Sequence, residues 1–111
     1  MAYDEELAGR IRALLGDEPA LTEKKMFGGL AFLIGGNMAI GASGQGGILV
    51  RADPDESDAL TAATTARPME MRGREMRGWL RVEADDVGTD AELSKWVDVG
   101  SAYARSLPEK D

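Results

Sequence analysis

The sequence contains no cysteine and no histidine. The lack of cysteine excludes disulfide bonds, thiol chemistry and cysteine-ligated zinc sites. The lack of histidine removes the commonest general base, so a Ser-His-Asp triad cannot form. These absences favour a non-enzymatic binding or regulatory module, and we expect no catalytic residue, no metal ligand and no cofactor.

Long hydrophobic runs are also missing. No segment approaches the roughly 20 apolar residues that are needed to cross a bilayer. The first residues, including Asp4, Glu5 and Glu6, are acidic where a secretory signal would be basic. We therefore expect a cytoplasmic protein without a membrane partner.

Positive charge is scarce as well. The chain has 13 Lys and Arg residues against 20 Asp and Glu residues, which gives a net charge of −7. Nucleic acid repels a protein this acidic unless a local basic patch outweighs the net charge.

The residues that are present fit one globular domain over positions 1–111. Of the 111 residues, 43% are hydrophobic and 30% are charged, as in ordinary folded proteins. Apolar residues at helical spacing predict a first helix over 4–15. A last helix is predicted to begin at the capping box Thr89-Asp90-Ala91-Glu92 and to end before Pro108. Gly100 lies in its apolar stripe and would allow a close approach to a sheet.

A third helix is predicted over 54–63, with Asp53 as its cap and Pro54 in its first turn. It is rich in alanine and has Leu60 as its only large apolar residue, so we expect it to lie shallowly on the sheet. Short apolar segments bounded by glycine-rich turns predict strands over 26–34, 38–42, 48–51, 67–71 and 77–82.

The predicted order is α-β-β-β-α-β-β-α. Short connections between neighbouring strands require antiparallel pairing. We therefore expect an α+β fold with two layers, in which helices pack on a mainly antiparallel five-stranded sheet. Gly28-Gly29 lies inside the first predicted strand and indicates a bulge or close backbone approach against the last helix. An anion site on its backbone N–H groups is the weaker interpretation.

Two motifs in this order carry a resemblance to a known family. The first is Lys25-Met26-Phe27-Gly28-Gly29, followed by Gly36-Asn37-Met38-Ala39 and Ile48-Leu49-Val50-Arg51. The second is Arg67-Pro68-Met69-Glu70-Met71-Arg72-Gly73-Arg74, followed by Met76-Arg77-Gly78-Trp79. Together with the flanking helices, they resemble the amino-terminal domain of the TfoX/Sxy family over nearly the whole chain.

This resemblance implies a two-layer fold like that of secretion chaperones. It also implies kinship with regulators that switch on DNA-uptake (competence) genes and act alongside the cyclic-AMP receptor protein. Those regulators carry a second, carboxy-terminal helical domain, whereas this sequence ends at Asp111. The resemblance therefore indicates a stand-alone single-domain member.

An arginine-rich segment, Arg67–Arg81, is the main candidate for a partner site. It holds five arginines against two glutamates. Pairing of these arginines with the chain's own acids, such as Glu83, ranks first, a protein partner second and nucleic acid third. In the protein-binding hypothesis, carboxylates of the partner are bound by Arg72, Arg74 and Arg77, with Trp79 as an apolar anchor.

Several alternatives remain open at this point. The favoured function is binding of another protein, for which the resemblance suggests a transcription regulator. Direct nucleic-acid binding through Arg67–Arg81 is the second hypothesis, and a small-ligand binder or carboxylate-using enzyme is the third. A homodimer is compatible with all three. The acidic run over 83–92 lacks the spacing of a helix–loop–helix calcium site, and most of the methionines are expected in the core.

Overall fold

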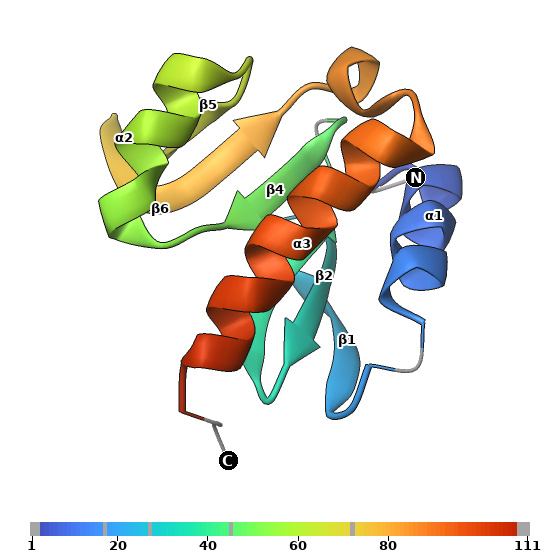
Figure 1. Ribbon diagram of the computed structural model, residues 1–111. Coiled ribbons are helices and arrows are strands. Elements are labelled where there is room, and N and C mark those ends of the chain that lie inside the picture. Colours follow the sequence, from blue (N-terminus) through green and yellow to red (C-terminus); the bar gives the residue numbers. More distant parts are fainter. Residues whose placement is uncertain (1–2, 17, 27, 45, 72, 109–111) are drawn as a thin grey trace.

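The computed structural model describes residues 3–16, 18–26, 28–44, 46–71 and 73–108. Within them, one layer of helices covers one face of a six-stranded antiparallel sheet with the order β1-β2-β3-β4-β6-β5 (Figure 1). The strands are β1 (Leu21–Met26), β2 (Gly29–Ile34), β3 (Asn37–Ala42), β4 (Ile48–Arg51), β5 (Arg67–Met71) and β6 (Arg74–Val82). The helices are α1 (Glu5–Leu15), α2 (Pro54–Ala63), the short 3-10 helix η1 (Ala84–Val87) and α3 (Asp90–Ser106). The predicted α+β class with helices packed on the sheet is confirmed.

The sheet has one strand more than the five predicted. The additional strand is β1, which lies at the edge of the sheet and pairs with β2. Its residues Glu23, Lys24 and Lys25 are charged and exposed. Charges are common on edge strands because they discourage pairing with other chains. They also remove the apolar alternation by which a strand is recognised in a sequence, which is why this strand was missed.

The Gly28-Gly29 pair lies at the hairpin between β1 and β2. Met26 pairs with Gly29, so the strand predicted over 26–34 is divided here into two. A Cβ atom on Gly29 would lie only 2.0 Å from the carbonyl oxygen of Ala42. The predicted close backbone approach is confirmed, but the neighbour is β3 and not the last helix.

The predicted helix boundaries follow from their caps. The carboxylate of Asp4 accepts hydrogen bonds from the N–H groups of Glu6 and Leu7 at 3.0 and 3.1 Å. Thr89 and Glu92 form the predicted capping box at the start of α3. Asp53 caps α2 by accepting from the N–H of Asp55. Each side chain satisfies backbone donors that have no partner inside the helix.

Helix α3 is the centre of the helical layer. It packs on β3 and β4, with α1 beside it (Figure 1). Leu93, Trp96 and Val97 are buried from α3, and Ile11 is fully buried from α1. Helix α2 instead packs on β6 and β5. The helices therefore divide the sheet between them, and α3 covers its middle.

Gly100 sets the distance between α3 and the sheet. A Cβ atom at this position would lie 2.1 Å from the carbonyl oxygen of Ala39. The register of β2 and β3 shifts at this point, since Phe32 pairs with Ile40 and Leu33 with Met38. The register thus skips Ala39, and this bulged residue presents its carbonyl group to Gly100. The predicted close approach of the last helix is confirmed.

Ion pairs between arginine and acidic side chains connect the elements around this core. Arg12 of α1 binds both carboxylate oxygens of Glu23 in β1, at 2.6 and 2.8 Å. Arg105 of α3 binds Glu18. In both pairs the arginine's hydrogen bond is the largest cause of a lowered pKa of the glutamate. The two pairs hold the ends of α1 and α3 to the chain around β1.

We predict opposite effects of adding a methyl group at two helical glycines. Gly100→Ala should lower the free energy of unfolding by roughly 1–3 kcal/mol, because backbone must move to accommodate the methyl group. Gly9→Ala is the matched control in α1, where an added Cβ has no neighbour within 4 Å. This control should gain about 0.5–1 kcal/mol from helix propensity. Urea unfolding of both variants measures the difference, and stabilisation by Gly100→Ala would contradict the close approach of α3.

We predict that the Arg12 pair makes stability depend on pH in the acidic range. A carboxyl whose pKa is lower in the folded state contributes stability at neutral pH and loses it as the pH falls through that lowered pKa. Arg12→Gln should raise the pKa of Glu23 toward its ordinary value and leave the pKa of Glu18, which is paired with Arg105, lowered. An NMR titration of the side-chain carboxyl groups measures both values. An unchanged Glu23 titration would show that Arg12 does not bind it in solution.

Candidate functional site

The four predicted partner-binding residues belong to the hairpin of β5 and β6. Arg72 lies outside the described residues, and Arg77 belongs to β6 but its side chain is not among those described. Arg74 is exposed at the start of β6. Trp79 is half-buried against a small cluster of Leu49, Met38 and Ala31 on the face of the sheet away from the helices. The joint arginine surface therefore remains a prediction.

Trp79 takes part in a stack of three side chains. It lies opposite Arg51 in the pairing of β4 and β6. The guanidinium carbon of Arg51 is 4.8 Å from the centroid of a Trp79 ring and 5.1 Å from the Tyr103 ring. Both distances fit cation–π contacts. Arg51 thus links Trp79 on the sheet to Tyr103 of α3, and the contact with Arg51 leaves less of Trp79 available as a partner anchor.

Two other arginines of the Arg67–Arg81 segment pair with the chain's own acid. Arg67 and Arg81 both bind Glu83. Arg81 also donates hydrogen bonds of 2.9 Å to the hydroxyl of Ser43 and the carbonyl of Gly46. The interpretation that ranked first, internal pairing, is confirmed for these two side chains. Glu83 offsets one of their two positive charges, so the segment offers less positive potential to nucleic acid than its arginine count suggests.

The described methionines and the acidic run add no further site. Met38 is buried and Met69 half-buried, both in or against the small cluster beneath Trp79, while the side chains of Met26, Met71 and Met76 lie outside the described set. The acids over 83–92 lead into the N-terminus of α3, as expected. Among the described residues, no group of three or more acidic side chains is arranged to hold a metal ion.

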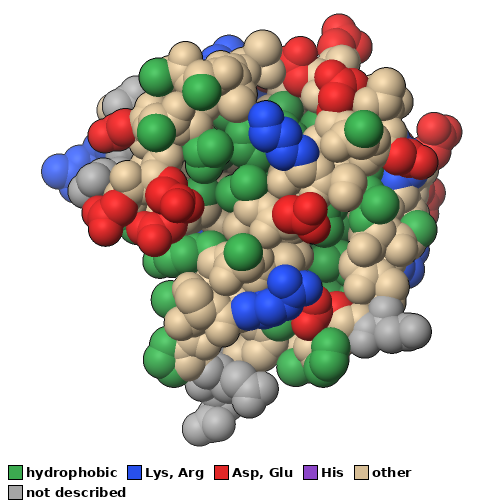
Figure 2. Space-filling model, in the orientation of Figure 1, with side chains coloured by type: hydrophobic (Ala, Val, Ile, Leu, Met, Phe, Trp, Pro, Cys, Tyr) green, Lys and Arg blue, Asp and Glu red, His purple; other side chains and the backbone are tan. Residues whose placement is uncertain are grey.

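A feature that the sequence did not indicate is a groove between α2 and α3, with a volume of about 670 Å³. Figure 2 shows its hydrophobic floor between the two helices, with acidic side chains beside it on the α2 side and a basic side chain at its upper edge. Six of its ten lining residues are apolar or aromatic: Ala59, Leu60, Ala63, Val99, Ala102 and Tyr103. The other four are Asp53, Glu56, Asp98 and Ser106.

The groove follows from the composition of α2. Leu60 is the only large apolar side chain of this helix, and it packs partly on the core beside Val99 of α3. Ala59 and Ala63 are too short to bridge to the neighbouring helix, and both are exposed. The shallow position predicted for α2 agrees with these exposed alanines, but the size of the space between the helices could not be read from the sequence. The sequence signal that could have indicated the groove is the stripe of small apolar residues, Ala59 and Ala63, one turn apart on α2.

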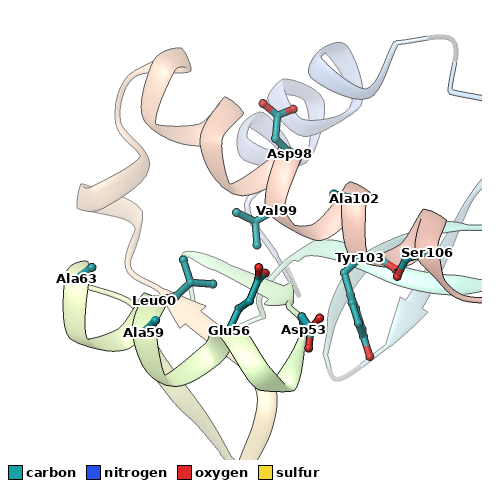
Figure 3. A pocket seen from close by; sticks show the side chains of 10 residues that line it. All are labelled: Asp53, Glu56, Ala59, Leu60, Ala63, Asp98, Val99, Ala102, Tyr103 and Ser106. Atoms are coloured by element: carbon teal, nitrogen blue, oxygen red, sulfur yellow. The ribbon is translucent and has the colours of Figure 1, made fainter.

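Charged groups border this apolar floor in an uneven way. Glu56 reaches from α2 toward Val99 across the groove, whereas Asp98 lies at the rim and points away from the floor (Figure 3). The carboxylate of Asp53 caps α2 near Tyr103. None of the ten lining residues is a lysine or arginine. The groove can therefore take an apolar ligand surface, and its charge favours a cation over an anion.

The comparisons with known proteins agree with the motifs in the sequence. The family model described as the TfoX N-terminal domain matches residues 13–104. No curated protein and no solved structure is similar enough to be matched to the chain. None of the described helices combines the length and apolar character that crossing a bilayer requires. With a family match that spans the entire sheet and most of α3, the chain belongs to the TfoX N-terminal domain family.

Proposed function

We propose that this domain is a non-enzymatic regulatory module that binds another protein through the groove between α2 and α3. The observation that carries the proposal is an apolar groove of about 670 Å³ on the surface of a small domain. Apolar surface exposed in a hollow is typical of sites that bind ligands or proteins. A transcription regulator is the partner class implied by the resemblance to competence regulators.

The shape of the groove favours a protein over a metabolite. Small-molecule sites enclose most of their ligand and orient it with a small number of precisely placed polar groups. This groove is open along the face in Figure 2, and its floor is formed by Leu60, Val99 and alanine side chains. Such a surface can cover one side of a polypeptide segment, and it does not enclose a small molecule.

The side chains of the groove also favour binding over catalysis. The chain has neither histidine nor cysteine. Of the polar groups in the groove, the carboxylate of Asp53 accepts the N–H of Asp55 at 2.9 Å and so serves as a helix cap. The hydroxyl of Ser106 donates to the carbonyl of Tyr103 at 2.6 Å, so it is engaged within its own helix. These roles support a contact surface.

We predict that filling the groove abolishes partner capture. Ala59→Trp places a large side chain in the groove, while Ala62→Trp is the matched control on the same helix, since Ala62 is exposed and does not line the groove. Tagged wild type and both variants are incubated with lysate of the native cells, and bound proteins are identified by mass spectrometry. The expected result is one protein enriched by wild type and by Ala62→Trp and lost with Ala59→Trp.

Two results would contradict this assignment. Equal capture by all three proteins would place the binding surface elsewhere, and enrichment of no protein above background would remove support for a binding module. The predicted arginine surface is tested in the same assay with Arg72→Glu/Arg74→Glu. If this double variant abolishes capture and Ala59→Trp does not, the partner binds the β5–β6 hairpin and the groove is not the site. Circular dichroism melts verify that every variant is folded.

A further inference from the structure

We infer that the occupant of the groove is a short amphipathic helix of another protein, with lysine or arginine beside its apolar anchor residues. The inference rests on the proposed function of the groove and adds the chemistry of the partner. It is carried by the nature of the walls, by the small side chains that line them and by the charge around them.

The walls favour a helical ligand. All ten lining residues belong to α2, its cap or α3. Backbone N–H and C=O groups inside a helix are already bonded to each other, so these walls offer no ladder to an extended peptide. A helix satisfies its own backbone and needs only side-chain contacts. The lining residues of α2 from Glu56 to Ala63 span about 10 Å at 1.5 Å per residue, which is two turns of such a ligand.

The small side chains favour large anchors on the partner. Leu60 and Val99 form the floor and are only partly buried, since they pack on the core from one side. Ala59 and Ala102 on the two walls are exposed and leave space above that floor. Apolar side chains spaced at i, i+3 or i+4 and i+7 lie on one face of a helix and would fill this space.

The charge favours basic flanks. The carboxylate of Glu56 points into the apolar groove (Figure 3), and neither Glu56 nor Asp98 forms an ion pair with a described residue. The sequence of α2 contains acids and no lysine or arginine. Since the whole chain carries −7, long-range attraction adds to the local effect. A lysine or arginine of the ligand would neutralise Glu56 and reach Asp98 at the opposite rim, whereas an acidic helix would be repelled.

A displayed peptide library tests this inference. Peptides of about 16 residues, long enough to form a helix on binding, have randomised positions in a helix-favouring background. They are selected in parallel on wild type, on Glu56→Lys/Asp98→Lys, and on Asp58→Lys/Asp85→Lys. The last variant is the matched control, because it changes the net charge equally at two exposed acids that do not line the groove.

The expected winners on wild type have an apolar stripe at helical spacing with lysine or arginine beside it. Their affinity should fall about tenfold on Glu56→Lys/Asp98→Lys, since two exposed ion pairs are lost and replaced by repulsion. It should change much less on the control variant, and binding should vanish on Ala59→Trp. The groove-reversed variant should itself enrich peptides with acidic flanks. Single variants Glu56→Gln and Asp98→Asn provide the same comparison if the double variant is unstable.

The outcomes separate the inference from the proposed function. Peptides that lose binding on Ala59→Trp but have no basic excess, or bind the groove-reversed variant equally well, would overturn the inference and leave the groove as a protein-binding site. Groove-dependent peptides that NMR shows to bind in an extended form would also overturn it. If no enriched peptide is sensitive to Ala59→Trp, the proposed site fails along with the inference.

Discussion

The contact between Gly100 and the carbonyl group of Ala39 determines how the two layers fit together. Only glycine at position 100 allows α3 to lie this close to β3, because a Cβ atom there would lie 2.1 Å from the carbonyl oxygen of Ala39. The bulge at Ala39 gives β3 the shape that receives the helix. With α3 fixed low over β3 and β4, Trp96 is 4% exposed and fills the core between the helix and the sheet. The other two α-helices pack around it: α1 lies against α3, and α2 lies on β6 and β5.

The groove is a consequence of that arrangement. Helix α1 has Leu7, Ile11 and Leu15 to bury and packs against α3. Helix α2 packs on β6 and β5 with Leu60 as its only large apolar side chain, so it has little to place against α3. A small domain gains stability from each apolar contact. Leaving an apolar groove unfilled between two of its helices therefore lowers its stability. The binding role that we propose would account for a surface of this kind.

The sequence predicted elements with strong local signals and missed features that depend on distance between elements. The cap at Asp4, the capping box at Thr89 and the apolar stripe of α3 can each be recognised from residues close together in the sequence, and the structure confirms all three. Strand β1 was missed because charges such as Lys24 dominate it, and only its pairing with β2 makes it a strand. The groove was missed for a related reason. Ala59 reads as an ordinary helix former, and its exposure beside α3 depends on how far apart two helices lie.

Charged side chains are distributed differently in the framework and around the groove. Arginines are used to hold the framework together: Arg12 binds Glu23, Arg105 binds Glu18, and Arg67 and Arg81 bind Glu83. The acids of α2 have no such neighbour on their own helix, which contains no basic residue. These arginines are therefore engaged within the fold, while the charged side chains that α2 contributes to the border of the groove are only acids. This distribution is the electrostatic basis of the proposed preference for a basic ligand, and it agrees with the low rank that the sequence analysis gave to nucleic acid.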